Sequence, residues 1–134
     1  MTLRELFLLI IQGYIGTPYR WGGDDPTGTD CSGLVNIATQ AIGKLGVKED
    51  RTAAGWYQHS NAALPEPGNL IFYKNKDGKV IHVEVLLAQV EGVWYSIGAS
   101  GGDSTTHTIA DAEARNAFVK VHAPRPGYEI RTIF

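Results

Sequence analysis

The chain has 134 residues, a single cysteine and a formal net charge of −2. A chain of this length is as long as one ordinary domain and can bury a core without disulfides or metal ions. Its 12 Lys and Arg residues are scattered along the sequence, which argues against the basic patch of a nucleic-acid-binding protein. We therefore predict a single domain over residues 1–134 that does not bind nucleic acid.

Apolar residues recur with helical spacing from about residue 3 to residue 13, which predicts an amphipathic helix that ends near Gly13 or Gly16. The apolar run is too short for a signal peptide, Arg4 is followed at once by Glu5, and no small-residue cleavage site follows. No other segment approaches the ~18 apolar residues of a membrane span. The sequence therefore predicts synthesis in the cytoplasm without a signal peptide, and no membrane partner.

Residues 17–29 are rich in Gly, Pro and Asp and predict a loop. Helical spacing of apolar residues resumes at Cys31, with Thr29 or Asp30 as the N-cap and two later glycines as stop signals. A short third helix is predicted at about residues 52–60. The cysteine is therefore expected at the start of the second helix.

After residue 68 the pattern changes to strands rich in Val, Ile, Phe and Tyr, and a hairpin turn is predicted at residues 75–78. The predicted strands are residues 69–74, 80–87, 93–97, 117–121 and 128–133. Residues 101–106 are predicted to form a surface loop, and residues 110–115 a helical turn or part of that loop. Helices followed by strands favour an α+β fold, with the helices packed on an antiparallel sheet.

Two interpretations of Cys31 are possible: it is a small buried hydrophobic residue, or it is a nucleophile. The start of a helix favours the second, because unpaired backbone N–H groups and the helix dipole stabilise a thiolate. A thiol that attacks a carbonyl also needs a nearby base and donors for the oxyanion.

Among the four histidines, His82 is the best candidate for the base, because it lies in an otherwise apolar strand. The alternative reading of His82 is a half-exposed residue on the solvent face of the sheet. His59 ends a helix, His107 lies in a polar loop and His122 stands at a strand end, so these three fit less well. No cluster of His, Cys and acidic residues has the spacing of a zinc site.

The chain resembles the NlpC/P60 family of papain-like cysteine peptidases, which cut bacterial cell-wall peptides. The resemblance covers most of the chain. It rests on the block Ile15–Gly23, the block Gly28–Leu34 around the cysteine, and shorter matches at Arg51–Thr52, Pro67–Phe72 and His82–Val83.

By this resemblance Cys31 is the nucleophile, His82 is the general base and the Tyr19 hydroxyl lies near the oxyanion. Asp30 and Ser32 fall at positions that hold the free amine of the substrate in such enzymes. The resemblance implies a papain-like fold and no metal or cofactor. It also implies a cysteine endopeptidase or amidase for peptidoglycan stem peptides, acting on the bond between γ-D-glutamate and a diamino acid.

Two departures from the family pattern concern the residue that orients the base. The family has a polar residue, often His, on the strand after the base, where this chain has Gly98. Ser96, which would share a strand face with residue 98, or His107, folding back from its loop, could replace it. Glu84 stands where a small residue is common, on the same side of the strand as His82, and could tune the imidazole, bind substrate or fill the pocket.

Two rival functions stay open. One is a related amidase or acyltransferase with another substrate, and the other is an inactive domain that binds wall peptides or forms part of a phage tail. Trp21 is a candidate substrate-binding residue, expected in the core or on the wall of the groove rather than as a platform for a carbohydrate. A catalytic domain without a leader also needs a carrier to reach the wall, so phage tail proteins or a secretion machine are candidate partners, and the protein could be a virion component.

Overall fold

The computed structural model describes residues 1–134 and contains four helices and two antiparallel sheets. The helices are α1 (Leu3–Gln12), α2 (Cys31–Ala41), α3 (Ala53–Gln58) and α4 (Ile109–Ala114). The strands are β1 (Asp24–Asp25), β2 (Gly28–Thr29), β3 (Asn61–Ala62), β4 (Leu70–Lys74), β5 (Val80–Val90), β6 (Val93–Ser100), β7 (Phe118–His122) and β8 (Glu129–Thr132).

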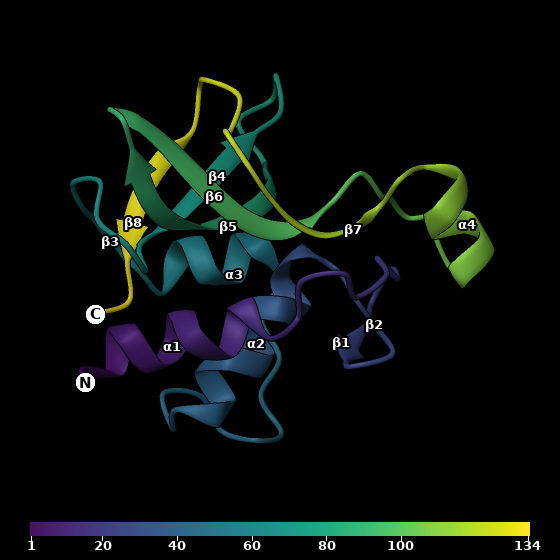
Figure 1. Cartoon of the computed structure of the whole chain (residues 1–134), viewed down its shortest axis with the longest axis horizontal. Helices are drawn as coiled ribbons and strands as arrows, with labels where there is room; N and C mark the ends of the chain where they lie inside the picture. Colours follow the sequence, from purple (N-terminus) through teal and green to yellow (C-terminus); the bar gives the residue numbers. More distant parts are fainter.

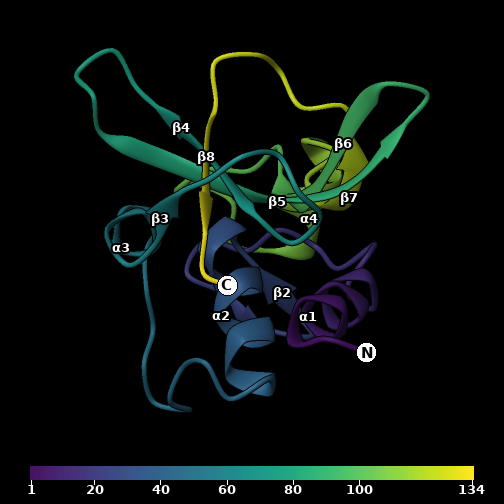
Figure 2. The ribbon, with the colours of Figure 1, turned by 90° about the vertical axis from the view of Figure 1, so that its left-hand side faces the viewer.

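The main sheet has six antiparallel strands in the order β3-β8-β4-β5-β6-β7, and β1 and β2 form a separate small ribbon. In Figure 1 the helices α1, α2 and α3 lie on one side of this sheet, and α4 lies beyond β7 at the far end. The view in Figure 2, turned by 90°, shows the same two layers. This arrangement confirms the predicted α+β class with helices packed on an antiparallel sheet.

Helix α1 is stabilised by a capped N-terminus and by an apolar face that packs into the core. Thr2 and Glu5 make a reciprocal capping box, in which each side chain accepts a hydrogen bond from the other residue's backbone N–H. Phe7 and Ile11, one turn apart, are fully buried. The ring of Phe134 meets that of Phe7 edge-on at 5.4 Å, so the C-terminus packs against α1.

One core cluster of 18 buried residues joins the helices to the sheet. Val83 and Val85 of β5 belong to it, together with Leu34 of α2. Side chains alternate along a strand, so His82 and Glu84 project from the opposite face of β5. On that face Ile71, Tyr73 and Leu86 form a second, smaller cluster.

The predicted elements need small corrections. Strands β5 and β6 run about three residues further than predicted, and the ribbon β1–β2 occupies a segment predicted to be a plain loop. The β3 strand at residues 61–62 was not predicted, because two exposed residues leave no apolar pattern to detect. None of the helices is long and apolar enough to cross a membrane.

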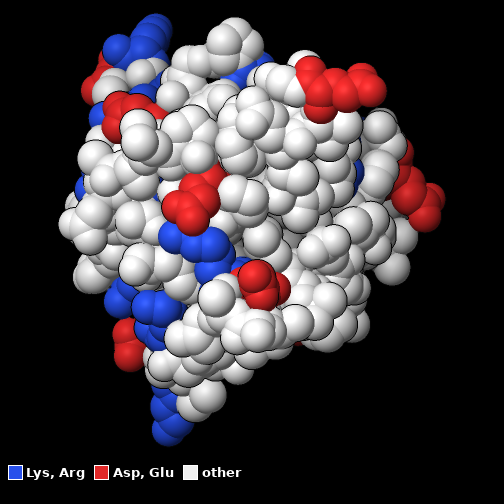
Figure 3. Space-filling model, turned by 60° about the vertical axis from the view of Figure 1, so that its left-hand side comes forward, with Lys and Arg blue, Asp and Glu red and all other residues white.

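Basic and acidic side chains lie beside one another on the face drawn in Figure 3, and no broad area of one sign forms there. The ion pairs of the chain include Lys74 with Glu129 at 2.9 Å and Arg20 with Asp25 at 3.0 Å.

Candidate active site

Cys31 is the first residue of α2, as the sequence predicts, and its side chain is partly exposed. Asp30, not Thr29, is the N-cap. Its Oδ1 accepts a hydrogen bond from the Gly33 N–H at 2.7 Å, and its Oδ2 accepts one from the Gly22 N–H at 2.9 Å. One carboxylate thus caps the helix and ties the preceding loop to it. The thiol is placed in the first turn, where the helix dipole favours a negative charge.

The glycines around Cys31 allow the loop and the helix to approach closely. A Cβ on Gly33 would lie 2.0 Å from the Gly23 carbonyl oxygen, and a Cβ on Gly23 would lie 2.4 Å from that of Gly28. Real Cβ atoms do not approach oxygen so closely, so any larger residue would push the loop away from α2. The glycine-rich pattern therefore serves packing against the nucleophile's helix.

His82 lies on β5 with 21% of its side chain exposed. Its Nε2 is 2.7 Å from Glu84 Oε2, so Nδ1 is the ring nitrogen that this contact leaves free. Burial of the ring opposes its charged form, but hydrogen bonding with Cys31 and Glu84 and the charges of both groups outweigh this and raise the pKa of His82 to about 10. The imidazole is therefore held as an imidazolium at neutral pH.

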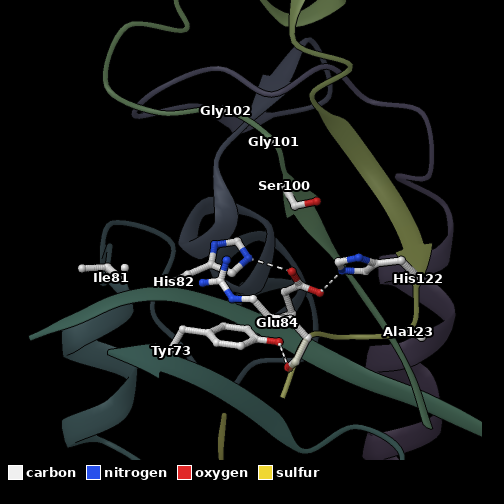
Figure 4. Close-up of a pocket in the computed structure, with 10 residues that line it drawn as sticks. Tyr73, Ile81, His82, Glu84, Ser100, Gly101, Gly102, His122 and Ala123 are labelled. Carbon is white, nitrogen blue, oxygen red and sulfur yellow. Dashed lines mark hydrogen bonds and ion pairs between the residues drawn. The ribbon is translucent and has the colours of Figure 1, made fainter. Parts of the chain in front are cut away.

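Glu84 is only 3% exposed, yet its carboxylate has three partners on the strands β5, β6 and β7. Oε2 pairs with His82, while Oε1 pairs with Ser96 Oγ at 2.6 Å and with His122 Nε2 at 2.7 Å. Figure 4 shows the carboxylate between the two imidazoles. Burial opposes ionisation, but these hydrogen bonds and the His82 charge together hold the pKa of Glu84 well below its usual value.

An ionised carboxylate can only accept hydrogen bonds, so each of the two ring nitrogens that face Glu84 carries the proton. In His82 this places the proton on Nε2 and fixes the ring orientation. The arrangement is the one that a base-orienting carboxylate makes in a catalytic triad.

Gly98 lies opposite Glu84 on the neighbouring strand, because Val85 pairs with Ile97 in the antiparallel register of β5 and β6. A Cβ on Gly98 would lie 2.6 Å from Glu84 Cγ and 3.2 Å from its Cβ and Cδ. Position 98, where the family resemblance predicts a side chain that orients the base, therefore has no side chain. The carbon chain of Glu84 occupies that space.

The structure corrects the expectation that Ser96 or His107 orients the base directly. Ser96 Oγ donates to Glu84 and makes no hydrogen bond with His82. His107 is exposed and lines a separate small cavity with Pro18 and Thr27. Glu84, expected to tune the imidazole, bind substrate or fill the pocket, contacts the imidazole itself.

His122 is the residue of this cluster that sequence reasoning missed. It stands at the end of β7, before Ala123 and Pro124, a place where an exposed histidine is ordinary. The signal that identifies it is non-local: His122 is the cross-strand partner of Ser96, so both side chains lie on the face that carries Glu84.

Tyr19 is 4% exposed and borders the same cleft as Cys31. Burial, followed by the negative charges of Cys31, Asp30 and Asp103, raises the pKa of the Tyr19 hydroxyl far above its ordinary value. The hydroxyl therefore stays protonated and can donate a hydrogen bond to a developing oxyanion beside the thiolate.

A cleft of about 650 Å³ brings the predicted residues together. The residues that line it include Tyr19, Trp21, Asp30, Cys31, His82 and Asp103. The Trp21 side chain is exposed, which places it on the groove wall and not in the core. Ser32 is not among the lining residues, and its Oγ donates to Asp30 Oδ1 at 3.3 Å.

Comparisons with known proteins identify the family of the chain. The sequence model of the NlpC/P60 family matches residues 16–123. The murein DD-endopeptidase MepH of Escherichia coli (strain K12) is 42% identical over 78 residues, which are 53% of this chain and 28% of MepH. The chain spans about a third or less of the length of the curated relatives it matches.

Solved structures show the same fold. The peptidoglycan hydrolase RipB of Mycobacterium tuberculosis has a TM-score of 0.71 at 25% identity, over 98% of this chain and 64% of RipB. RipD of the same organism, described as a non-catalytic protein adapted to peptidoglycan binding, has a TM-score of 0.67 at 20% identity, over 100% of this chain and 99% of RipD. The chain belongs to the NlpC/P60 family.

Proposed function

We propose that this domain hydrolyses an amide bond in peptidoglycan stem peptides, with Cys31 as the nucleophile and His82 as the base. The main support is that the only thiol of the chain lines one cleft with an imidazole held by a buried carboxylate. The substrate class is supported by the names of MepH and RipB, a murein endopeptidase and a peptidoglycan hydrolase.

The chemistry follows from the thiolate–imidazolium pair. The Cys31 thiolate attacks the amide carbonyl, and a carbon–sulfur bond forms while the oxygen becomes negative. Tyr19 and backbone N–H groups at the start of α2 donate hydrogen bonds to this oxygen. The His82 imidazolium gives its proton to the leaving nitrogen as the carbon–nitrogen bond breaks.

Water completes the cycle. Neutral His82 removes a proton from a water molecule, which attacks the thioester carbonyl, and the carbon–sulfur bond breaks to restore the Cys31 thiolate and the imidazolium. No step in this sequence needs a group from outside the protein other than water.

Glu84 acts on His82 as a positioning residue in this proposal. It holds the protonated Nε2 and so keeps Nδ1 toward Cys31, the task of the third residue in a triad. Gly98 by itself would favour a binding domain that has lost catalysis. The carboxylate that fills the space above Gly98 supplies the missing function, so hydrolysis is the better-supported proposal.

The bond that we propose is the one between γ-D-glutamate and the diamino acid, either meso-diaminopimelate or L-lysine. Asp30 in the cleft supports this choice, because a carboxylate can hold the free amine of a short stem peptide near the cysteine.

Digestion of purified peptidoglycan of the diaminopimelate and lysine types tests the proposal. Wild-type protein should release fragments whose masses identify the bond, and Cys31→Ala should release none. Circular dichroism of Cys31→Ala controls for folding. If folded wild-type protein released no fragment from either wall, hydrolysis would be contradicted and a wall-peptide-binding role favoured.

A further inference from the structure

A second cavity, of about 640 Å³, adjoins the cleft that contains Cys31. Both are lined by Ile81, His82 and Gly102, but Cys31 lines only the first. Figure 4 shows the second cavity with His82, Glu84 and His122 along one side. The imidazole thus stands at the boundary between two spaces that together can hold the two halves of a cleaved peptide.

The proposed reaction assigns one half of the substrate to each space, and this step rests on the proposed function. The acyl half becomes bonded to Cys31 and so occupies the first cleft. The leaving half receives its proton from the His82 nitrogen that faces Cys31, and the rest of this half can then continue past the imidazole into the adjoining space, which Cys31 does not line. The second cavity is therefore placed to receive the amine half.

Arg125 gives this cavity a cationic side chain with no acidic partner. No Asp or Glu oxygen lies within 4.0 Å of its guanidinium, and the group makes no hydrogen bond within the chain. Glu84, the acidic residue of the cavity, is already engaged by two histidines and a serine. The guanidinium is therefore available to a ligand.

Tyr73 holds Arg125 in place from both ends. The guanidinium carbon lies 4.4 Å from the centre of the Tyr73 ring, and the Tyr73 hydroxyl donates to the Arg125 carbonyl oxygen at 2.9 Å. A guanidinium stacked on an aromatic ring keeps its N–H fork free for a planar acceptor, and a carboxylate fits that fork with two parallel hydrogen bonds.

The two spaces also differ in charge. Asp30, Asp103 and Lys79 border the first cleft. Asp103 is paired with Arg115, whereas Asp30 has no cationic side-chain partner and can attract a substrate amine. The second cavity has Arg125 and the two histidines that surround the Glu84 carboxylate. A peptide with an amine on its acyl half and a carboxylate on its leaving half matches this order of charges.

We propose that Arg125 binds a free carboxylate on the amine half of the stem peptide. Two groups have this chemistry: the side-chain carboxylate of meso-diaminopimelate, which L-lysine lacks, and the C-terminal carboxylate of the peptide. In the first case Arg125 selects the diamino acid, and in the second it selects stem peptides that end shortly after the cleaved bond.

Synthetic stem peptides that differ only in these groups separate the two sources. The set contains free diaminopimelate, diaminopimelate with an amidated side-chain carboxylate, and lysine, each with a free or amidated C-terminus. For the peptide with the recognised carboxylate, Arg125→Gln should lower kcat/KM about tenfold or more, mainly through KM. For the peptide that lacks it, the change should stay below about twofold. Arg125→Lys, which keeps the charge but not the fork, should fall between the two.

Lys76→Gln is the matched control, because it removes one positive charge from an exposed turn outside both cavities. Equal kcat/KM for all six peptides with wild-type protein and with Arg125→Gln would overturn the subsite while leaving hydrolysis intact. If wild-type protein cleaved none of them, calorimetric binding of the same peptides to Cys31→Ala and Cys31→Ala/Arg125→Gln would decide. Carboxylate-dependent binding lost with Arg125 would support the subsite without the hydrolase, and binding indifferent to Arg125 would refute it.

Discussion

The two walls of the cleft that Cys31 and His82 line are built in different ways. On the helix wall, Cys31, its cap Asp30 and the packing glycines Gly23 and Gly33 lie within eleven residues of one another, and their contacts are made inside one loop and the first turn of α2. On the sheet wall, the imidazole depends on groups from three strands. Local contacts are set by sequence spacing, whereas the sheet wall exists only when the register of β5, β6 and β7 is correct.

This contrast predicts that one substitution on the sheet wall disturbs all of its side-chain contacts together. On the helix wall, each substitution should disturb only its own contacts. Three sets of variants test the contrast, beginning with the residue on which the sheet wall depends most.

Replacing Glu84 should have the largest effect. Glu84→Gln keeps the size of the side chain but removes the charge that holds Nε2 of His82 protonated, and we expect kcat to fall by about 100-fold or more. Glu84→Ala should also lower the free energy of unfolding by about 3 kcal/mol, because it leaves buried partners unpaired. Peptide hydrolysis and urea unfolding measure the two effects.

A pH titration of His82 distinguishes a role of Glu84 in positioning the imidazole from a purely structural role of Glu84. In wild-type protein the His82 imidazolium should persist until the pH approaches 10, and in Glu84→Gln it should lose its proton at a lower pH because a stabilising negative charge is gone. Since the folded pKa of His82 is raised, its contribution to stability is complete below about pH 6.5 and lost as the pH rises through 10. An unchanged His82 titration in Glu84→Gln, followed by NMR, would contradict the role of Glu84.

Gly98→Ala should damage the same wall less. The added methyl would lie 2.6 Å from Glu84 Cγ, so the carboxylate must shift, and we expect about tenfold lower kcat and about 1–3 kcal/mol lower stability. Gly55→Ala in α3 is the control, because its Cβ would meet neighbours at an ordinary 3.4 Å. Wild-type activity in Gly98→Ala would show that Glu84 does not need the space above this glycine.

Loss of the cap on the helix wall should have the smallest effect on stability. Asp30→Ala removes the cap on α2 and should cost about 1 kcal/mol of stability. Asp30→Asn keeps an oxygen for the Gly33 N–H but cannot also accept from the Gly22 N–H, so its loss should be smaller. Thermal unfolding measures both. An equal loss in the two variants would mean that the charge of Asp30 or its hydrogen bond with Gly22, and not the capping bond with Gly33, stabilises this wall.

Much of the helix wall could be predicted from the sequence alone. The start of α2 at Cys31 follows from apolar spacing and a capping residue, and both signals lie within a few positions of the cysteine. The α+β class follows from the order of helical and strand patterns along the chain. His82 stood out as a polar ring within an apolar strand, because such a residue needs a partner when it is buried.

The partner of that ring could not be identified from the sequence. Glu84 reaches His82 because Gly98 leaves room on the neighbouring strand, and His122 reaches Glu84 because it pairs across β6 and β7 with Ser96. Arg125 enters the second cavity through its stacking on Tyr73, more than fifty positions earlier. Sequence spacing determined the place of the cysteine, the helix that begins there and the fold class. Only the tertiary structure decided what holds the His82 imidazole, because strand register joins residues that no local pattern connects.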